Sequence, residues 1–188
     1  MDLLVEAKKS NKKAFYELVE NYKHIFYKTA RIFFTSDEDI YPVIQKTLTQ
    51  GYKELVNVKT EEEFLCWNLK ILIENCVKQK EKFSKDIGRT LSKREIYVSI
   101  TDKISSSEST IGNAEYQTYR RHSLVEEYIT SIEPAHRIPA LLYFYANLSI
   151  KDISQILKES EFNISKIIDK SRIKIYEWLR IRRLIYNG

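Results

Sequence analysis

The chain has 188 residues, of which 43% are hydrophobic, enough for one medium core or two small ones. Its net charge of +5 favours a polyanionic partner, and four Gly and three Pro favour long helices over hairpins. No stretch approaches the roughly 18 apolar residues of a membrane span, and the N-terminus lacks the long apolar run of a signal peptide.

Apolar residues recur at helical spacing throughout the first segment, residues 2–82. Pro42 is compatible with a helix there only in its first turn, where its missing N–H has no intrahelical partner. We therefore expect three helices: one capped by Ser10 or Asn11 and running through Glu20, one after a loop at 35–39 and running through Tyr52, and one from about Glu63 to Lys82 after a polar break at 57–62.

The middle of the chain, residues 83–122, is rich in serine and has no sustained helical stripe. This composition predicts a flexible linker, with a short strand or extended piece at 96–100.

Helical periodicity returns in residues 123–188. A helix is expected around Tyr128, and Pro134 and Pro139 bracket the start of the next, which carries Leu141 and Leu142. We expect an all-α protein with two small helical domains, 1–82 and 123–188, joined by the flexible linker at 83–122.

The most informative stretch is Leu148–Leu179. Ser149 is expected to cap a short helix, with Asp152 completing a near-capping box, and Ser160 to cap a longer helix. The longer helix has isoleucines on one side and polar, basic residues on the other. This pattern predicts a helix-turn-helix whose second helix enters the major groove, although Lys158 stands in the turn where Gly is common. An ordinary helical hairpin is the alternative.

Positive charge concentrates between Lys166 and Arg183. Seven Lys or Arg stand there against Asp169 and Glu177, a local balance of +5 that equals the net charge of the whole chain. Such a cluster suits a phosphate backbone, and a solvated basic helix is the alternative. The candidate DNA-binding residues of this helix are Ser160, Asn163, Ser165, Lys166, Asp169, Lys170, Arg172 and Lys174.

The C-terminal stretch resembles the −35-binding region of the extracytoplasmic-function (ECF) sigma factors. Ile132, Pro134 and Arg137 match that family's Leu-Pro-X-X-X-Arg entry. Residues 3–22 resemble the family's opening helix, residues 36–55 the region that docks on the polymerase clamp helices, and residues 64–80 its −10 region, anchored by Phe64, Trp67, Lys70 and Ile71.

Some residues depart from the family pattern. Pro42 and Lys46 replace a usual Asp and a usual Glu on the clamp-binding helix, and Gly51 weakens that helix by up to about 1 kcal/mol. Glu74 falls where an Asn is common, with Asn75 next to it. The resemblance therefore leaves open whether polymerase docking is weaker than in typical members.

The resemblance implies a sigma factor that binds core RNA polymerase, through its clamp helices and flap, and recognises −10 and −35 promoter DNA. It also implies an anti-sigma partner. Residues implied for −10 recognition are Asn57, Lys59, Lys70, Lys78 and Lys80, and those implied for clamp contact are Val43, Gln45, Leu48, Thr49 and Tyr52.

No catalytic motif in the sequence supports an interpretation as an enzyme. The sequence shows no Gly-rich phosphate loop, nucleophile elbow or zinc-type spacing, so no cofactor or metal is expected. Cys66 and Cys76 are expected to be buried, reduced thiols of a cytoplasmic protein. Two non-enzymatic alternatives remain: a stand-alone helix-turn-helix regulator, and a structural helical adaptor with a basic face.

Overall fold

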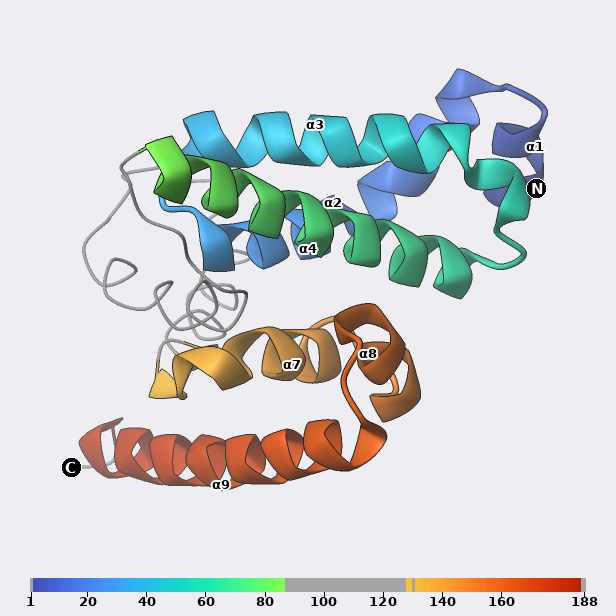
Figure 1. Ribbon diagram of the computed structural model, residues 1–188. Helices are drawn as coiled ribbons and strands as arrows, with labels where there is room; N and C mark the ends of the chain where they lie inside the picture. Colours follow the sequence, from blue (N-terminus) through green and yellow to red (C-terminus); the bar gives the residue numbers. More distant parts are fainter. Residues whose placement is uncertain (1, 87–127, 130, 187–188) are drawn as a thin grey trace. The chain divides into compact units, whose positions relative to one another are not determined.

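The computed structural model describes residues 2–86, 128–129 and 131–186, and every regular element in these ranges is a helix (Figure 1). The chain divides into two compact units, Met1–Ile96 and Tyr97–Gly188. The predicted all-α class with two helical domains is confirmed. None of the described helices combines the length and the apolar character that crossing a membrane requires.

The described residues of the first unit, 2–86, form four α-helices and one short 3-10 helix. The Asn11 side chain accepts the N–H groups of Lys13 and Ala14, which decides between the two expected caps. Ser10 instead adopts a left-handed backbone, φ 66°, at the preceding turn. The elements are α1 (Leu3–Lys8), α2 (Lys12–Phe33), α3 (Asp37–Lys53), η1 (Leu55–Asn57) and α4 (Glu61–Asp86).

Two expectations about these helices were wrong. Pro42 lies in the second turn of α3, because Ser36 caps the helix and Asp37 begins it. A proline there removes one backbone N–H···O hydrogen bond near the end of the helix, where this loss is tolerated better than at the centre of the helix. In addition, α4 continues to Asp86, past the predicted linker start at residue 83. The rest of that linker, and the strand expected at 96–100, fall outside the described residues.

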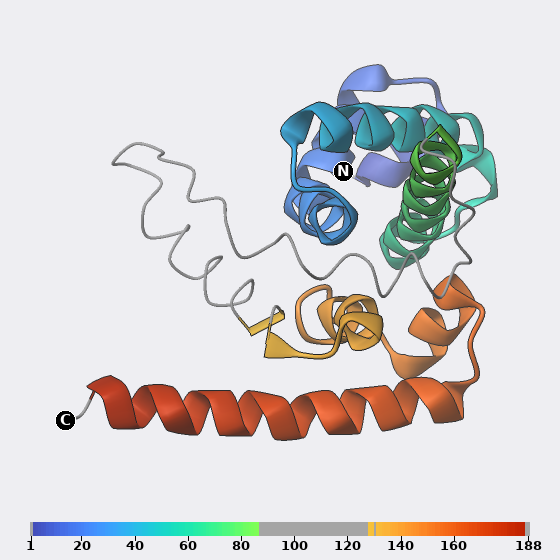
Figure 2. The same cartoon turned by 60° about the vertical axis from the view of Figure 1, so that its left-hand side comes forward.

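The core of the first unit lies between α2, α3 and α4, which pack side by side, with α1 against α2 (Figure 2). Fully burying one large apolar side chain contributes about 1.5–3 kcal/mol. The largest side chains buried here are Leu18, Phe26, Ile40, Val43, Phe64, Leu69 and Leu72.

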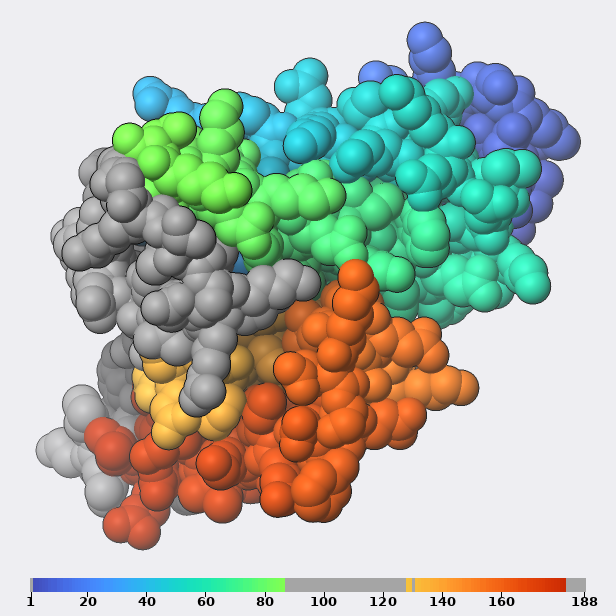
Figure 3. Space-filling view, viewed as in Figure 1, coloured from blue at the N-terminus to red at the C-terminus, as the bar shows by residue number. Residues whose placement is uncertain are grey.

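Polar contacts fix α3 against α4, two helices that form one continuous face of this unit (Figure 3). The buried Asn75 amide donates to Thr47 Oγ1 at 3.1 Å and to Gln50 Oε1 at 2.7 Å. The Thr47 hydroxyl in turn donates a hydrogen bond to the Val43 carbonyl at 2.8 Å. Asn75 therefore ties the two helices together, while Glu74 lies half-buried beside it.

The second unit contains α7 (Pro134–Phe144), α8 (Ile150–Leu157) and α9 (Glu161–Tyr186). Pro134 occupies the first turn of α7, as expected. The buried Arg137 donates through Nε to the Ile132 carbonyl, which fixes the entry into α7. Tyr128 donates to the Ser171 carbonyl at 3.1 Å, and burial raises the pKa of its hydroxyl to about 12. The core is formed by Leu142, Ile153, Ile164 and Ile168.

Candidate nucleic-acid interface

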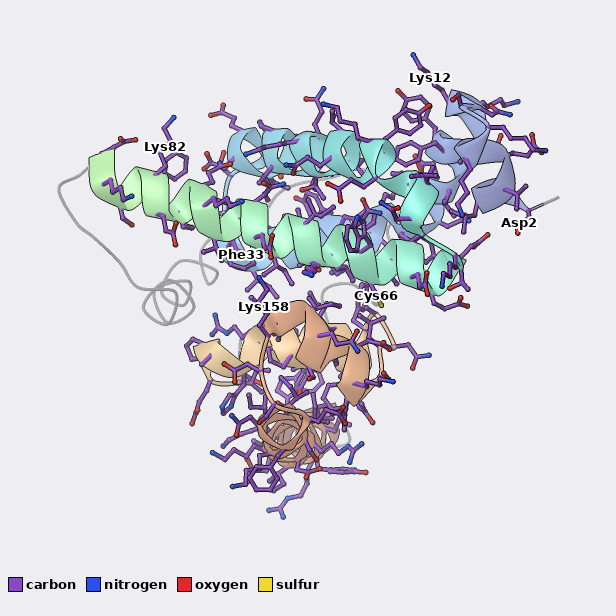
Figure 4. The ribbon with its side chains drawn as sticks, turned by 45° about the vertical axis from the view of Figure 1, so that its right-hand side comes forward. Asp2, Lys12, Phe33, Cys66, Lys82 and Lys158 are labelled. Carbon is purple, nitrogen blue, oxygen red and sulfur yellow. The ribbon has the colours of Figure 1, made fainter. Side chains whose placement is uncertain are left out.

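A three-residue turn, 158–160, joins α8 to α9 and forms the predicted helix-turn-helix. Ser149 caps α8: its hydroxyl accepts the Asp152 N–H and donates to the Asp152 carboxylate. Lys158, labelled in Figure 4, ends α8 in the left-handed conformation, φ 58°. Glycine adopts this conformation without cost. Lys158, which stands where Gly is common, therefore has a strained backbone.

The start of α9 is fixed by side chains of the turn. Ser160 Oγ accepts the Asn163 N–H at 3.2 Å, which confirms Ser160 as the cap. Ser154 donates to the Glu159 carbonyl at 2.8 Å and so holds the turn to α8. The turn is therefore tied to both helices.

Helix α9 has two distinct faces. Ile164, Ile168 and Ser171 are buried against α7 and α8. Of the eight residues predicted to contact DNA, Ser165 is half-buried and the other seven are exposed. The fold therefore leaves this polar face open for a ligand.

Cations on this face are engaged with neighbouring groups of their own unit. Arg172 donates to the Tyr143 hydroxyl at 2.7 Å and pairs with Asp169 at 3.3 Å, and Lys174 pairs with Glu177 at 3.1 Å. These exposed pairs are weak, so a phosphate can replace them at little cost. These contacts orient Arg172 and Lys174, and both cations stay available to a polyanion.

Phe162 was not among the residues predicted from the sequence. It is 67% exposed, and Lys166 Nζ lies 4.2 Å from the centre of its ring. Its position two residues before Ile164 places it about 200° around the helix from the core face. That offset was readable in the sequence, but a phenylalanine in an isoleucine-rich helix is easily taken for a core residue.

The residues implied for clamp contact lie mostly on one exposed side of α3. Gln45 and Thr49 are exposed, while Leu48 and Tyr52 are half-buried, and their spacing of three and four residues places all four on one face. Val43 is the exception, because it is only 2% exposed and points into the core. Its selection as a contact residue was wrong: two residues before Gln45, it falls on the opposite side of the helix.

The residues implied for −10 recognition do not form one row. Asn57 ends η1 and Lys59 lies in the loop before α4. Both are exposed, and the Lys59 N–H donates to Glu63 Oε2 at 2.7 Å. Thr60 caps α4 by accepting the Glu63 N–H at 3.1 Å. The loop is therefore held by two hydrogen bonds with Glu63, one from Lys59 and one to the capping residue Thr60.

The three lysines of α4 implied for −10 recognition do not lie on one side of the helix. Lys78 and Lys80 are two residues apart, so they project to opposite sides of the helix. Lys80 Nζ lies 5.0 Å from the Phe34 ring, and Lys70 Nζ lies 5.6 Å from the Trp67 ring. Lys78 is exposed, whereas Lys70 and Lys80 are half-buried, and Lys70 lies about 80° around the helix from each of the other two.

The thiols and acids of the described residues suggest no catalytic or metal chemistry. Cys76 is buried, and burial raises the pKa of its thiol, which keeps it protonated and unreactive. Cys66 is only half-buried, so the expectation of two buried thiols holds for one of them. Within the described ranges, no group of three His, Cys, Asp or Glu side chains is placed to hold a metal ion.

Comparison with known proteins gives a match in fold. No family model and no curated protein matches the chain. Among solved structures, the chain is similar to CnrH, as seen in the structure of CnrH in complex with the cytosolic domain of CnrY. The TM-score is 0.57 and the identity is 16%, and the match covers 95% of this chain and 96% of that chain. The likeness therefore concerns the fold over nearly the full length of both chains.

Proposed function

We propose that this protein is a sigma factor, which binds core RNA polymerase and directs transcription initiation at promoters with −10 and −35 elements. The observation that carries the proposal is the exposed polar and basic face of α9 within a helix-turn-helix. CnrH, whose fold matches almost the whole chain, is an ECF sigma factor. The sequence resemblance to the same family rests on sequence motifs and does not depend on that match.

Run-off transcription with the full chain and core RNA polymerase tests the proposal. Transcripts that start at a defined position only when the chain is present are expected. A stand-alone regulator would bind duplex DNA but give no such transcripts, and a structural adaptor would do neither. Absence of chain-dependent initiation across a genomic promoter library would therefore reject the sigma role.

Docking on core polymerase is assigned to the outer side of α3. We expect Gln45→Ala combined with Leu48→Ala to weaken binding to core polymerase, because both side chains project from the same face of α3. Neither side chain belongs to the fully buried core, so the domain should stay folded. The exposed Tyr16 on α2, replaced by Ala, serves as the matched control and should bind normally. Affinity is measured by fluorescence anisotropy, with circular dichroism as a check on folding. Equal binding by the wild type and the double variant would show that polymerase docks on a surface other than this side of α3.

The −35 element is assigned to the outer face of α9. Lys166→Ala is expected to change base preference and to cost about 1–3 kcal/mol, since Lys166 lies in the N-terminal half that reaches bases. Arg172→Ala should weaken binding to all duplexes alike and lower the salt-dependence slope by about one unit.

Tyr143→Phe is the control for Arg172, because it removes the hydroxyl that holds Arg172 and keeps the charge. It should leave the slope unchanged. A change of base preference in Arg172→Ala, with none in Lys166→Ala, would reverse the proposed orientation of α9 in the groove.

An anti-sigma factor is the expected regulatory partner. CnrH was solved in complex with the cytosolic domain of CnrY, which supports a similar partner for a chain that shares its fold. Co-purification of the tagged chain from its native host, followed by inhibition of run-off transcription with the captured protein, tests this expectation.

A further inference from the structure

Phe162 is a large apolar side chain that folding leaves in water. It occupies the second position of α9 and is 67% exposed. Ser160 and Asn163 make the capping bond of this helix, so Phe162 takes no part in the cap. The core residue Ile164 is two positions away, on the opposite side of the helix. The local fold therefore gives no reason for a phenylalanine at this position.

The ring lies in the same row of side chains as two lysines. Phe162, Lys166 and Lys170 are spaced by four residues, so they follow one another along the exposed side of α9. Lys166 Nζ lies 4.2 Å from the ring centre, a cation–π contact that holds the ammonium group beside the ring. An apolar surface and a positive charge are thereby presented together at the N-terminal end of the helix.

In the major groove an A·T base pair, unlike a G·C pair, presents one apolar group, the C5 methyl of thymine. Phenylalanine is one of the side chains able to pack on it, and the flanking lysines complement the phosphates beside the groove. We infer that Phe162 is a specificity-determining residue whose ring packs on a thymine methyl in the −35 element while it positions Lys166. The inference rests on the proposed function, because it takes α9 as the helix that enters the groove.

Replacement of thymine by deoxyuridine tests the contact, because the two bases differ only in the C5 methyl. The full chain bound to core RNA polymerase first selects its preferred −35 sequence from a randomised duplex library. Each thymine of that sequence is then replaced singly. For the wild type we expect about fourfold weaker binding at one position, the effect of one buried methyl group. Phe162→Ala should bind the thymine and deoxyuridine duplexes equally.

Tyr176→Ala is the matched control. Tyr176 is an aromatic residue of the same helix, 72% exposed, and lies about 21 Å further along the axis. This variant should keep the fourfold difference. Both substitutions are at exposed positions, and circular dichroism verifies that both variants keep the helical content of the wild type.

The outcomes separate this inference from the proposed function. A selected element without thymine, a wild type insensitive to deoxyuridine, or a fourfold difference that persists in Phe162→Ala would each overturn the inference and leave the sigma role intact. A wild type that neither binds core polymerase nor selects any duplex would overturn the proposed function, and the assignment of Phe162 with it.

Discussion

Lys158 shows how one residue can depart from a local rule without changing the fold. It ends α8 with a φ of 58°, in the region that residues with a Cβ atom disfavour by about 1–2 kcal/mol. The turn nevertheless closes, because Ser154 and Ser160 bind the adjoining backbone on both sides. The strain sits between the two helices of the candidate DNA-binding motif.

Lys158→Gly should therefore stabilise the protein. Glycine removes the strain but increases the entropy of the unfolded chain, so we expect a net gain of up to about 1 kcal/mol in the free energy of unfolding. Urea denaturation followed by circular dichroism measures it. Lys158→Ala is the control, because it removes the same charge and keeps the Cβ atom. An equal gain from alanine would show that the charge, and not the backbone, is responsible.

At the scale of helices, the contact between α3 and α4 depends on a glycine. A Cβ atom at Gly51 would overlap Asn68 Oδ1. Asn68 is fully buried and its amide donates to the Phe64 carbonyl at 2.8 Å, so its side chain is not free to move aside. Gly51 weakens α3 as an isolated helix, and the close approach to α4 is what requires it there.

Gly51→Ala is expected to lower the free energy of unfolding by about 1–3 kcal/mol, the usual cost of overpacking a core. In the background of Asn68→Ala the obstacle is gone. The same substitution should then be neutral or stabilising by up to about 1 kcal/mol, from helix propensity alone. A double-mutant cycle in urea measures the coupling. Equal costs in both backgrounds would show that the two residues do not compete for space.

At the scale of the whole molecule, the two units differ in what they present. The first is held together by aromatic and aliphatic residues on three long helices, with a buried polar contact between helices at Asn75. The second has a small isoleucine core and a long helix whose outer side is polar and basic. Because each unit has its own core, each is expected to fold by itself.

Fragments 1–96 and 97–188, expressed separately, test this expectation. Each should unfold cooperatively on heating, and each midpoint should lie within a few degrees of a transition seen in the full chain. Circular dichroism follows the helical content. A fragment that lacks a cooperative transition would show that its core depends on the other half of the chain.

The sequence by itself determined the helical class, the two domains, the caps at Ser149 and Ser160 and the two sides of α9. These follow from local spacing, because a period of 3.6 residues and a capping hydroxyl act within a few residues of chain. It also placed Lys158 in the turn, at a position where Gly is common.

Only the tertiary structure decided how the helices face one another. It buried Val43, explained Gly51 through Asn68 and gave Asn75 hydrogen-bond partners on another helix. Each of these depends on which side of a helix another segment covers. That choice is made by packing between residues far apart in the chain, and a local pattern specifies a helix without specifying its neighbours.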